Sequence, residues 1–109
     1  MTIFKPELEK KSGSNTSNIK FRVIRPKTLG APPAARYMHS VDYIADLGIV
    51  VIYGGRNDFD KNPVMNDVFA LKLYNLEWVR VMVGGRILAI PRCNHSSVVN
   101  GTELIICGG

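Results

Sequence analysis

Short runs of apolar residues, alternating with polar positions, dominate the chain and predict β-strands. Residues 48–53 are apolar on both faces and rich in β-branched side chains, which is typical of a strand covered on both sides. Residues 67–73 and 77–83 alternate between two faces, and only three residues separate them, so we expect a hairpin. Residues 40–43 predict a further short strand before a turn at 45–48. No stretch keeps the period of a helix.

The same landmarks occur twice along the chain, about 56 residues apart. Residues 36–40 read Arg-Tyr-Met-His-Ser, and residues 92–96 read Arg-Cys-Asn-His-Ser. Each copy is followed by an apolar run that ends in a glycine pair, at 54–55 and at 108–109. One period therefore holds four strands with short connections, which predicts one antiparallel sheet. Periods of this order are typical of solenoids and propellers.

Taken together, the landmarks resemble the Kelch repeat, the blade unit of Kelch-type β-propellers. They are Arg36, His39, Gly54, Gly55, Trp78, Arg92, His95, Gly108 and Gly109. The resemblance covers about residues 18–109, with one complete repeat over 35–91, the start of the next over 92–109 and the end of an earlier one before them. It implies an all-β fold, a partial Kelch-type β-propeller made of four-stranded antiparallel blades.

Each landmark has a physical reason to be structural. The glycine pairs end buried strands, where the backbone approaches a neighbour closely or φ turns positive. The two arginines can bond several loop carbonyls at once, and the two histidines start strands, where an imidazole can tie one sheet to the next. Trp78 offers a large flat surface to fill the gap between sheets, and Phe21 stands at its position in the earlier repeat. Phe69 and Lys72 depart from the family's usual tyrosine and aspartate.

A propeller is a ring of several blades, and this chain supplies about one and a half. Residues 1–17 are expected to be the remnant of a preceding blade or a flexible segment, with the Ser/Asn-rich stretch 11–18 a long hairpin loop or a disordered tail. Apolar faces and sheet edges would then lie open. We therefore expect a fragment whose ring is completed by a longer chain or by self-association.

Composition and charge narrow the class of protein. With 109 residues, 46% of them apolar and 21% charged, the chain has the make-up of one globular domain. The net charge of +5 is concentrated in residues 1–36, but no aromatic residues interleave with these basic ones, so we expect a solvated surface and no nucleic-acid partner. A basic arm that binds nucleic acid remains the alternative. No signal peptide and no long apolar run are present, which predicts no membrane partner and a cytoplasmic or nuclear protein.

No motif of an enzyme, cofactor site or metal site is visible, and we predict none within these residues. The spacing of Cys93, His95 and Cys107 matches no zinc pattern. Cys107 aligns with Tyr53 inside an apolar strand, so we expect it to be a small core residue.

The connections of an antiparallel sheet alternate between its two ends, so the loops 56–65, 83–91 and 25–35 should lie at one end. The loop 56–65 is the longest within the repeat, and its Phe59, flanked by charges, resembles an interface anchor. Its aspartates lack the glycine and the distal glutamate of a calcium loop. A plain solvated loop is the alternative. The predicted contact residues are Arg56, Asn57, Asp58, Phe59, Asp60, Lys61 and Arg86.

The resemblance implies a protein–protein interaction or scaffold module that binds a partner protein through this loop face. The alternative is the propeller portion of a larger enzyme, for example one fused to a phosphatase domain or one similar to galactose oxidase, which binds copper. A copper oxidase would need a cluster of histidine and tyrosine on one face, and a fused catalytic domain would lie outside these residues.

Overall fold

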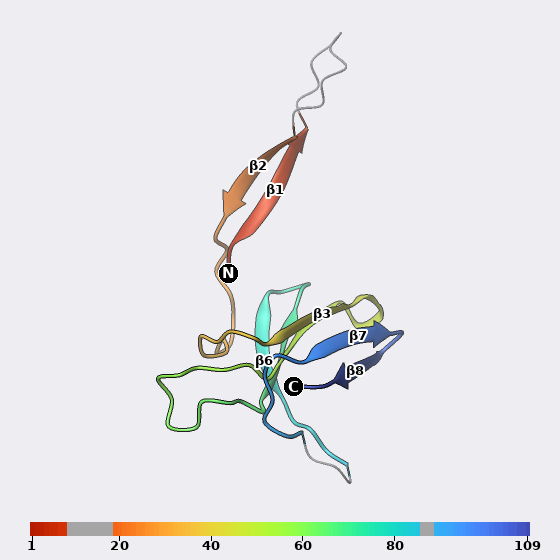
Figure 1. The fold of residues 1–109 in the computed structure, drawn as a ribbon. Coiled ribbons are helices and arrows are strands. Elements are labelled where there is room, and N and C mark those ends of the chain that lie inside the picture. Colours follow the sequence, from red (N-terminus) through yellow and green to blue (C-terminus); the bar gives the residue numbers. More distant parts are fainter. Residues whose placement is uncertain (9–18, 86–88) are drawn as a thin grey trace.

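The computed structural model describes residues 1–8, 19–85 and 89–109, and these residues are all-β with antiparallel pairing between the named strands (Figure 1). The strands are β1 (Ile3–Leu8), β2 (Ile19–Ile24), β3 (Ser40–Ile44), β4 (Ile49–Tyr53), β5 (Val68–Lys72), β6 (Glu77–Val81), β7 (Ser96–Asn100) and β8 (Glu103–Cys107). The one helical element among the described residues is a single 3-10 turn, Ala45–Leu47. The predicted all-β class is therefore confirmed.

A four-stranded sheet in the order β3-β4-β5-β6 forms the centre of the molecule. The 3-10 turn closes the first hairpin, and Gly48 ends it in the left-handed region with φ 61°. The β5–β6 hairpin turns through residues 73–76, where Leu76 has φ 56°. Each strand lies inside or within one residue of its predicted range, because alternation and tight turns are local signals that the sheet did not override.

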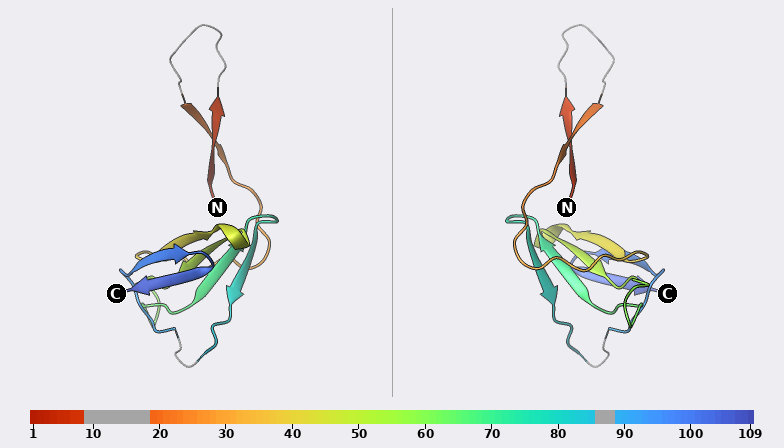
Figure 2. Two further views of the ribbon diagram at one scale, coloured as in Figure 1. Left: turned by 90° about the vertical axis from the view of Figure 1, so that its right-hand side faces the viewer. Right: turned by 90° about the vertical axis from the view of Figure 1, so that its left-hand side faces the viewer.

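One two-stranded sheet precedes the central sheet in the sequence, and a second two-stranded sheet follows it. β1 and β2 pair over their whole length, from Ile3 opposite Ile24 to Leu8 opposite Ile19. This hairpin stands apart from the rest, whereas β7 and β8 lie against the central sheet next to β3 (Figure 2). The first eight residues are thus mostly strand, and the predicted loop or tail at 11–18 lies outside the described residues.

The core lies within the central sheet. Its buried apolar residues are Ile44, Val51, Tyr53, Phe69, Ala70 and Leu71. Register places Val51, Tyr53 and Ala70 on the face toward β7 and β8. On the opposite face, Val50 and Ile52 are only half-buried. Cover on that second face is therefore incomplete: Phe69 and Leu71, which lie opposite Ile52 and Val50, are buried there, whereas the two β4 side chains are not.

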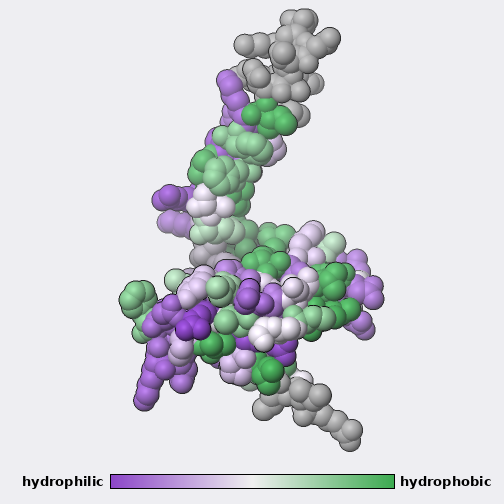
Figure 3. Space-filling view, viewed as in Figure 1, coloured by the Kyte–Doolittle hydropathy of each residue, from purple (hydrophilic) through white to green (hydrophobic). Residues whose placement is uncertain are grey.

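Apolar side chains lie open on three surfaces of the described residues. Phe4, Phe21 and Val23 share one face of the β1–β2 hairpin, and their exposed fractions are 63%, 59% and 54%. Green apolar patches along the hairpin and on the body show the same distribution (Figure 3). Val41 and Tyr43 on β3, and Val98 and Ile105 on the β7–β8 sheet, are also exposed. Contiguous exposed apolar faces are typical of interaction surfaces.

In the part of the chain described here, no helix has both the length and the apolar character needed to cross a membrane.

Candidate functional site

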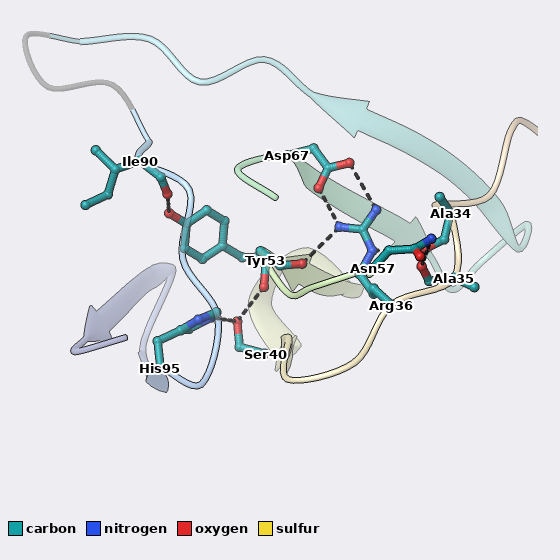
Figure 4. Close-up of polar contacts among 10 residues, drawn as sticks. Ala34, Ala35, Arg36, Ser40, Tyr53, Asn57, Asp67, Ile90 and His95 are labelled. Atoms are coloured by element: carbon teal, nitrogen blue, oxygen red, sulfur yellow. Dashed lines mark hydrogen bonds and ion pairs between the residues drawn. The ribbon is translucent and has the colours of Figure 1, made fainter. Parts of the chain in front are cut away.

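Arg36 is the structural hub of the central sheet. Its guanidinium donates to the carbonyls of Ala34 and Gly54, each at 3.0 Å, and forms a two-pronged ion pair with Asp67 in which Nη2 lies 3.0 Å from Oδ2 (Figure 4). The side chain is 3% exposed, and its Cζ lies 5.6 Å from the centre of the Phe69 ring. One side chain thus joins the incoming loop, the end of β4 and the start of β5. The sequence analysis predicted that the arginine bonds loop carbonyls. It did not predict Asp67, the residue that directly precedes β5.

The second copy of the motif repeats this geometry. Arg92 Nη1 donates to the carbonyl of Gly108 at 2.9 Å, as Arg36 Nη1 does to Gly54. Three pairs of corresponding residues share positive φ angles: Met38 (58°) with Asn94 (56°), Gly54 (67°) with Gly108 (78°) and Gly55 (101°) with Gly109 (103°). The repeat in sequence is therefore also a repeat in backbone conformation.

The two copies contact each other through side chains at or near the starts of β3 and β7. The His95 Nε2 and the Ser40 hydroxyl oxygen are 2.9 Å apart, and the Ser97 hydroxyl donates to Asp42 at 2.6 Å. Both contacts join residues that are 55 positions apart, one fewer than the 56 between the two arginines, so each residue of the second copy contacts the residue after its counterpart in the first. The His95 ring also lies 5.1 Å from that of Tyr53. One histidine therefore ties β7 to the strand pair β3–β4, while the Nδ1 atoms of His39 and His95 are buried without a partner among the described residues.

The first glycine pair lies where backbones meet. A Cβ on Gly54 would lie 2.4 Å from the carbonyl oxygen of Arg92, and one on Gly55 would lie 2.8 Å from the His39 Cβ. The Gly55 amide also donates to the Arg92 carbonyl at 3.0 Å. Only glycine combines a positive φ with so little room, which supplies the physical reason for the pair.

Trp78 lies half-buried on β6, opposite Leu71 and on the same face as Phe69. Its backbone amide donates to the carbonyl of Leu29 at 2.9 Å. The connecting segment before β3 therefore pairs with the outer edge of β6. The predicted place of the indole in a gap between neighbouring sheets stays a prediction.

The surroundings of His39 and His95 disfavour the protonated, charged form of both imidazoles. Burial lowers the pKa of His39, and the nearby Arg36 guanidinium lowers it further. Burial likewise lowers the pKa of His95, and the charge of Arg92 acts in the same direction, against a smaller opposing effect of Asp42. Both imidazoles are therefore held neutral in the folded chain at neutral pH.

We predict that folding stability falls as the pH is lowered below about 6.5, the ordinary histidine value. Between that value and the lower pKa values of the folded state, the unfolded chain binds protons that the folded chain does not, so stability decreases and then levels off. Urea unfolding midpoints between pH 7.5 and 5 would measure this. The double variant His39→Gln and His95→Gln should flatten the profile, and an unchanged wild-type midpoint over this range would contradict the prediction.

The loop 56–65 is braced at its base by a cluster of three side chains. Arg56 pairs with Tyr37 through two backbone hydrogen bonds of 2.8 and 3.0 Å. The Arg56 Nε and the Tyr37 hydroxyl each donate to Asp58, at 2.5 Å. These two hydrogen bonds hold the pKa of the Asp58 carboxyl below its ordinary value, and the bond to Asp58 raises the pKa of Tyr37.

The tip of the loop presents its aromatic residue to solvent. The Asn57 side chain donates to the carbonyl of Ala35 at 3.2 Å and accepts the amide of Phe59 at 3.0 Å. Asp60 and Lys61 are exposed, and Phe59 is completely exposed. The structure thus brings six of the predicted contact residues together on one braced loop. The seventh, Arg86, lies outside the described residues.

The described residues hold no group of three or more histidine, cysteine, aspartate or glutamate side chains that could bind a metal ion. Cys93 and Cys107 are free thiols. Cys107 is exposed, so its predicted place in the core was wrong. The strand is apolar as expected, but its outward face has no described neighbour to cover it.

Comparison with known proteins shows what the chain is similar to. No protein-family model matches the chain. A curated protein named Rho GTPase-activating protein gacHH, from Dictyostelium discoideum, is 35% identical over 88 residues. The match covers 81% of this chain and 5% of that protein. The chain is therefore similar to a small segment of a much longer relative.

Proposed function

We propose that the chain is part of a Kelch-type β-propeller in which β3 to β6 form one blade and β7 and β8 begin the next. Support comes from the two copies of the arginine–histidine–glycine corner, which share φ angles and the hydrogen bond from arginine to glycine. The two copies also contact each other directly, as neighbouring units of a repeat protein do. On this reading the β1–β2 hairpin is the outer half of a preceding blade.

The function that this geometry supports best is protein–protein interaction through the loop 56–65. The observation that carries it is Phe59, an aromatic side chain that is 101% exposed at the tip of a braced loop. Leaving such a ring in water is unfavourable, whereas an aromatic anchor at the centre of an interface contributes strongly to binding. The charged side chains of Asp58, Asp60 and Lys61 would form the polar rim around it.

We predict that Phe59→Ala removes binding of the partner protein and leaves the fold intact. A photo-crosslinking amino acid at position 61 would capture the partner in cells, and mass spectrometry would quantify it. We expect at least a tenfold loss of crosslinked partner, roughly the effect of losing one interface anchor. The melting temperature should stay unchanged, because the Phe59 ring makes no buried contact.

Tyr74→Ala is the matched control, since Tyr74 is an aromatic residue that is 79% exposed in the turn at the opposite end of the sheet. This variant should capture as much partner as the wild type. Equal capture by the Phe59 variant, or an equal loss with the Tyr74 variant, would overturn the loop as the interaction surface.

A second candidate is that the chain forms a non-catalytic portion of a larger enzyme. The observation in its favour is the similarity to a segment of a protein named as a Rho GTPase-activating protein, where the matched segment is 5% of the whole. The two candidates are compatible, because an interaction module can position a catalytic domain that lies elsewhere in a longer protein.

A further inference from the structure

The segment that leads into β3 crosses the outer edge of β6. β6 is the last strand of the central sheet, and its other edge pairs with β5. On the outer edge, the Leu29 amide donates to the carbonyl of Leu76 and the Trp78 amide donates to the carbonyl of Leu29, each at 2.9 Å. The two bonds form a parallel bridge between Leu29 and Glu77. We call residues 28–30 the strap.

The position of the strap depends on a glycine. Gly30 has φ +73°, and a Cβ there would lie 2.3 Å from the carbonyl oxygen of Trp78. Because this obstacle is backbone, a larger residue would push the strap away from β6. The Leu29 side chain is 55% exposed, so it contributes little buried contact. Two backbone hydrogen bonds thus hold the strap, and its detachment would leave the core of the sheet in place.

The strap covers only the first part of the β6 edge. It occupies the Trp78 amide. Because backbone groups alternate between the two edges of a strand, the amide and the carbonyl of Arg80 point to the same outer edge. No described strand pairs with that part of the edge. An edge of this kind is a template for pairing with another strand, and detachment of the strap would add the Trp78 amide to its available groups.

The β6 sequence is complementary to itself when two copies run antiparallel with Val79 at the two-fold axis. This register places Trp78 opposite Arg80 of the second copy and Glu77 opposite Val81, so no like charges face each other. An arginine beside an indole is a favourable cation–π arrangement. A register centred on Arg80 would instead place two arginines directly opposite each other, which is destabilising.

The bound strap and a second β6 compete for the same groups. In the register centred on Val79, each of the two Trp78–Arg80 pairs would exchange two hydrogen bonds, with the Trp78 amide donating one of them. In the folded chain that amide donates to Leu29, and the strap backbone at Gly30 lies against the Trp78 carbonyl. The strap and a second β6 therefore cannot occupy the edge at the same time.

We propose that the strap is an autoinhibitory contact that prevents β6 from pairing with β6 of a second copy of this chain. While the strap is bound, the edge is closed. When it detaches, two copies join antiparallel around Val79, and their four-stranded sheets become continuous. The inference uses only described residues from the interior of the sequence, and it depends neither on the loop 56–65 nor on the proposed propeller.

The test compares the wild-type chain with Gly30→Ala by amide hydrogen exchange and light scattering at a low and a high chain concentration. In the wild type, the Trp78 amide should be protected and the Arg80 amide unprotected at both concentrations. In the dilute variant, Trp78 should exchange about tenfold faster, as the loss of one hydrogen bond implies. In the concentrated variant, both amides should become protected together, and the molar mass should rise towards that of a dimer.

Gly101→Ala is the matched control, because Gly101 has φ +62° and a Cβ there would meet nothing within 4 Å. This variant should match the wild type at β6. If Gly30→Ala fails to fold, Leu29→Pro takes its place, since proline removes the amide that donates to Leu76. Arg80→Pro, added to either strap variant, should restore the monomer because it removes an outward amide that the pairing needs.

Three exchange results would overturn the proposal. The first is an unchanged rate at Trp78 in the strap variant. The second is a strap variant in which Trp78 and Arg80 stay unprotected at high concentration, even if the mass rises, because another surface would then be the contact. The third is protection of Arg80 in the wild type that rises with concentration. Phe59→Ala should change none of these rates, so a failure here is distinguishable from a failure of the loop surface.

Discussion

Replacing Arg36 by alanine is expected to destabilise the folded chain by about 3–5 kcal/mol, as removal of one partner of a buried ion pair does. The side chain is 3% exposed and satisfies Asp67 together with the carbonyls of Ala34 and Gly54. Without it, a partly buried carboxylate and two carbonyls lose their donors. Because a small domain has only about 5–15 kcal/mol of net stability, much of the population should unfold. Urea denaturation followed by circular dichroism measures the effect.

Two controls distinguish the stability lost with the Arg36–Asp67 ion pair from the stability lost on removing any arginine. Arg80→Ala removes an exposed arginine from β6 and should change stability by no more than about 0.5 kcal/mol. The double variant Arg36→Met and Asp67→Leu removes both charges and should be less destabilised than Arg36→Ala alone, because no unpaired charge remains. If Arg36→Ala and Arg80→Ala cost the same, Arg36 is not the hub of the sheet.

Gly54→Ala is the second substitution from which we expect a large loss. The new Cβ would lie 2.4 Å from the backbone oxygen of Arg92, and φ at this position is +67°. The left-handed conformation costs a non-glycine residue roughly 1–2 kcal/mol, and overpacking typically adds 1–3 kcal/mol. Because the obstacle is backbone, it cannot rotate away. We expect a loss of about 3 kcal/mol and a disturbed contact between the two copies of the motif, measurable as altered amide shifts around His95.

Gly48→Ala is the matched control, because it isolates the conformational part of this cost. Gly48 has φ +61°, close to that of Gly54, but a Cβ there would meet nothing within 4 Å. Its substitution should cost about 1 kcal/mol, the strain of the left-handed region alone. Equal costs at the two glycines would show that close packing at Gly54 contributes nothing.

The elements of this fold could be predicted where the signal is local. Apolar and polar residues alternate in 67–73 and 77–83, with a short turn between them. This local pattern is sufficient to predict β5 and β6. The repeated arginine and glycine motif located the two corners whose φ angles prove to match. Such features depend on a few neighbouring residues, so tertiary packing had little opportunity to alter them.

Contacts between distant residues could not be predicted in the same way. Asp67 lies 31 positions from Arg36, and Tyr37 lies 21 from Asp58, so neither pair leaves a periodic pattern in the sequence. The sequence also shows that Cys107 and Val50 belong to apolar strands, but not which of their faces finds a neighbour. Burial is a property of the assembled sheets, which is why both were expected to be better covered than they are.

By itself, then, the sequence determined the β class, the strand order within one repeat and the positions that must be glycine, because these follow from side-chain alternation and backbone strain over a few residues. Only the tertiary structure decided that Arg36 is neutralised by Asp67, whereas no carboxylate among the described residues pairs with Arg92, and that the Phe59 side chain is fully exposed on a braced loop. These outcomes depend on which chemically similar groups are brought within about 3 Å of each other, and hydrogen bonds and ion pairs are formed only at that range.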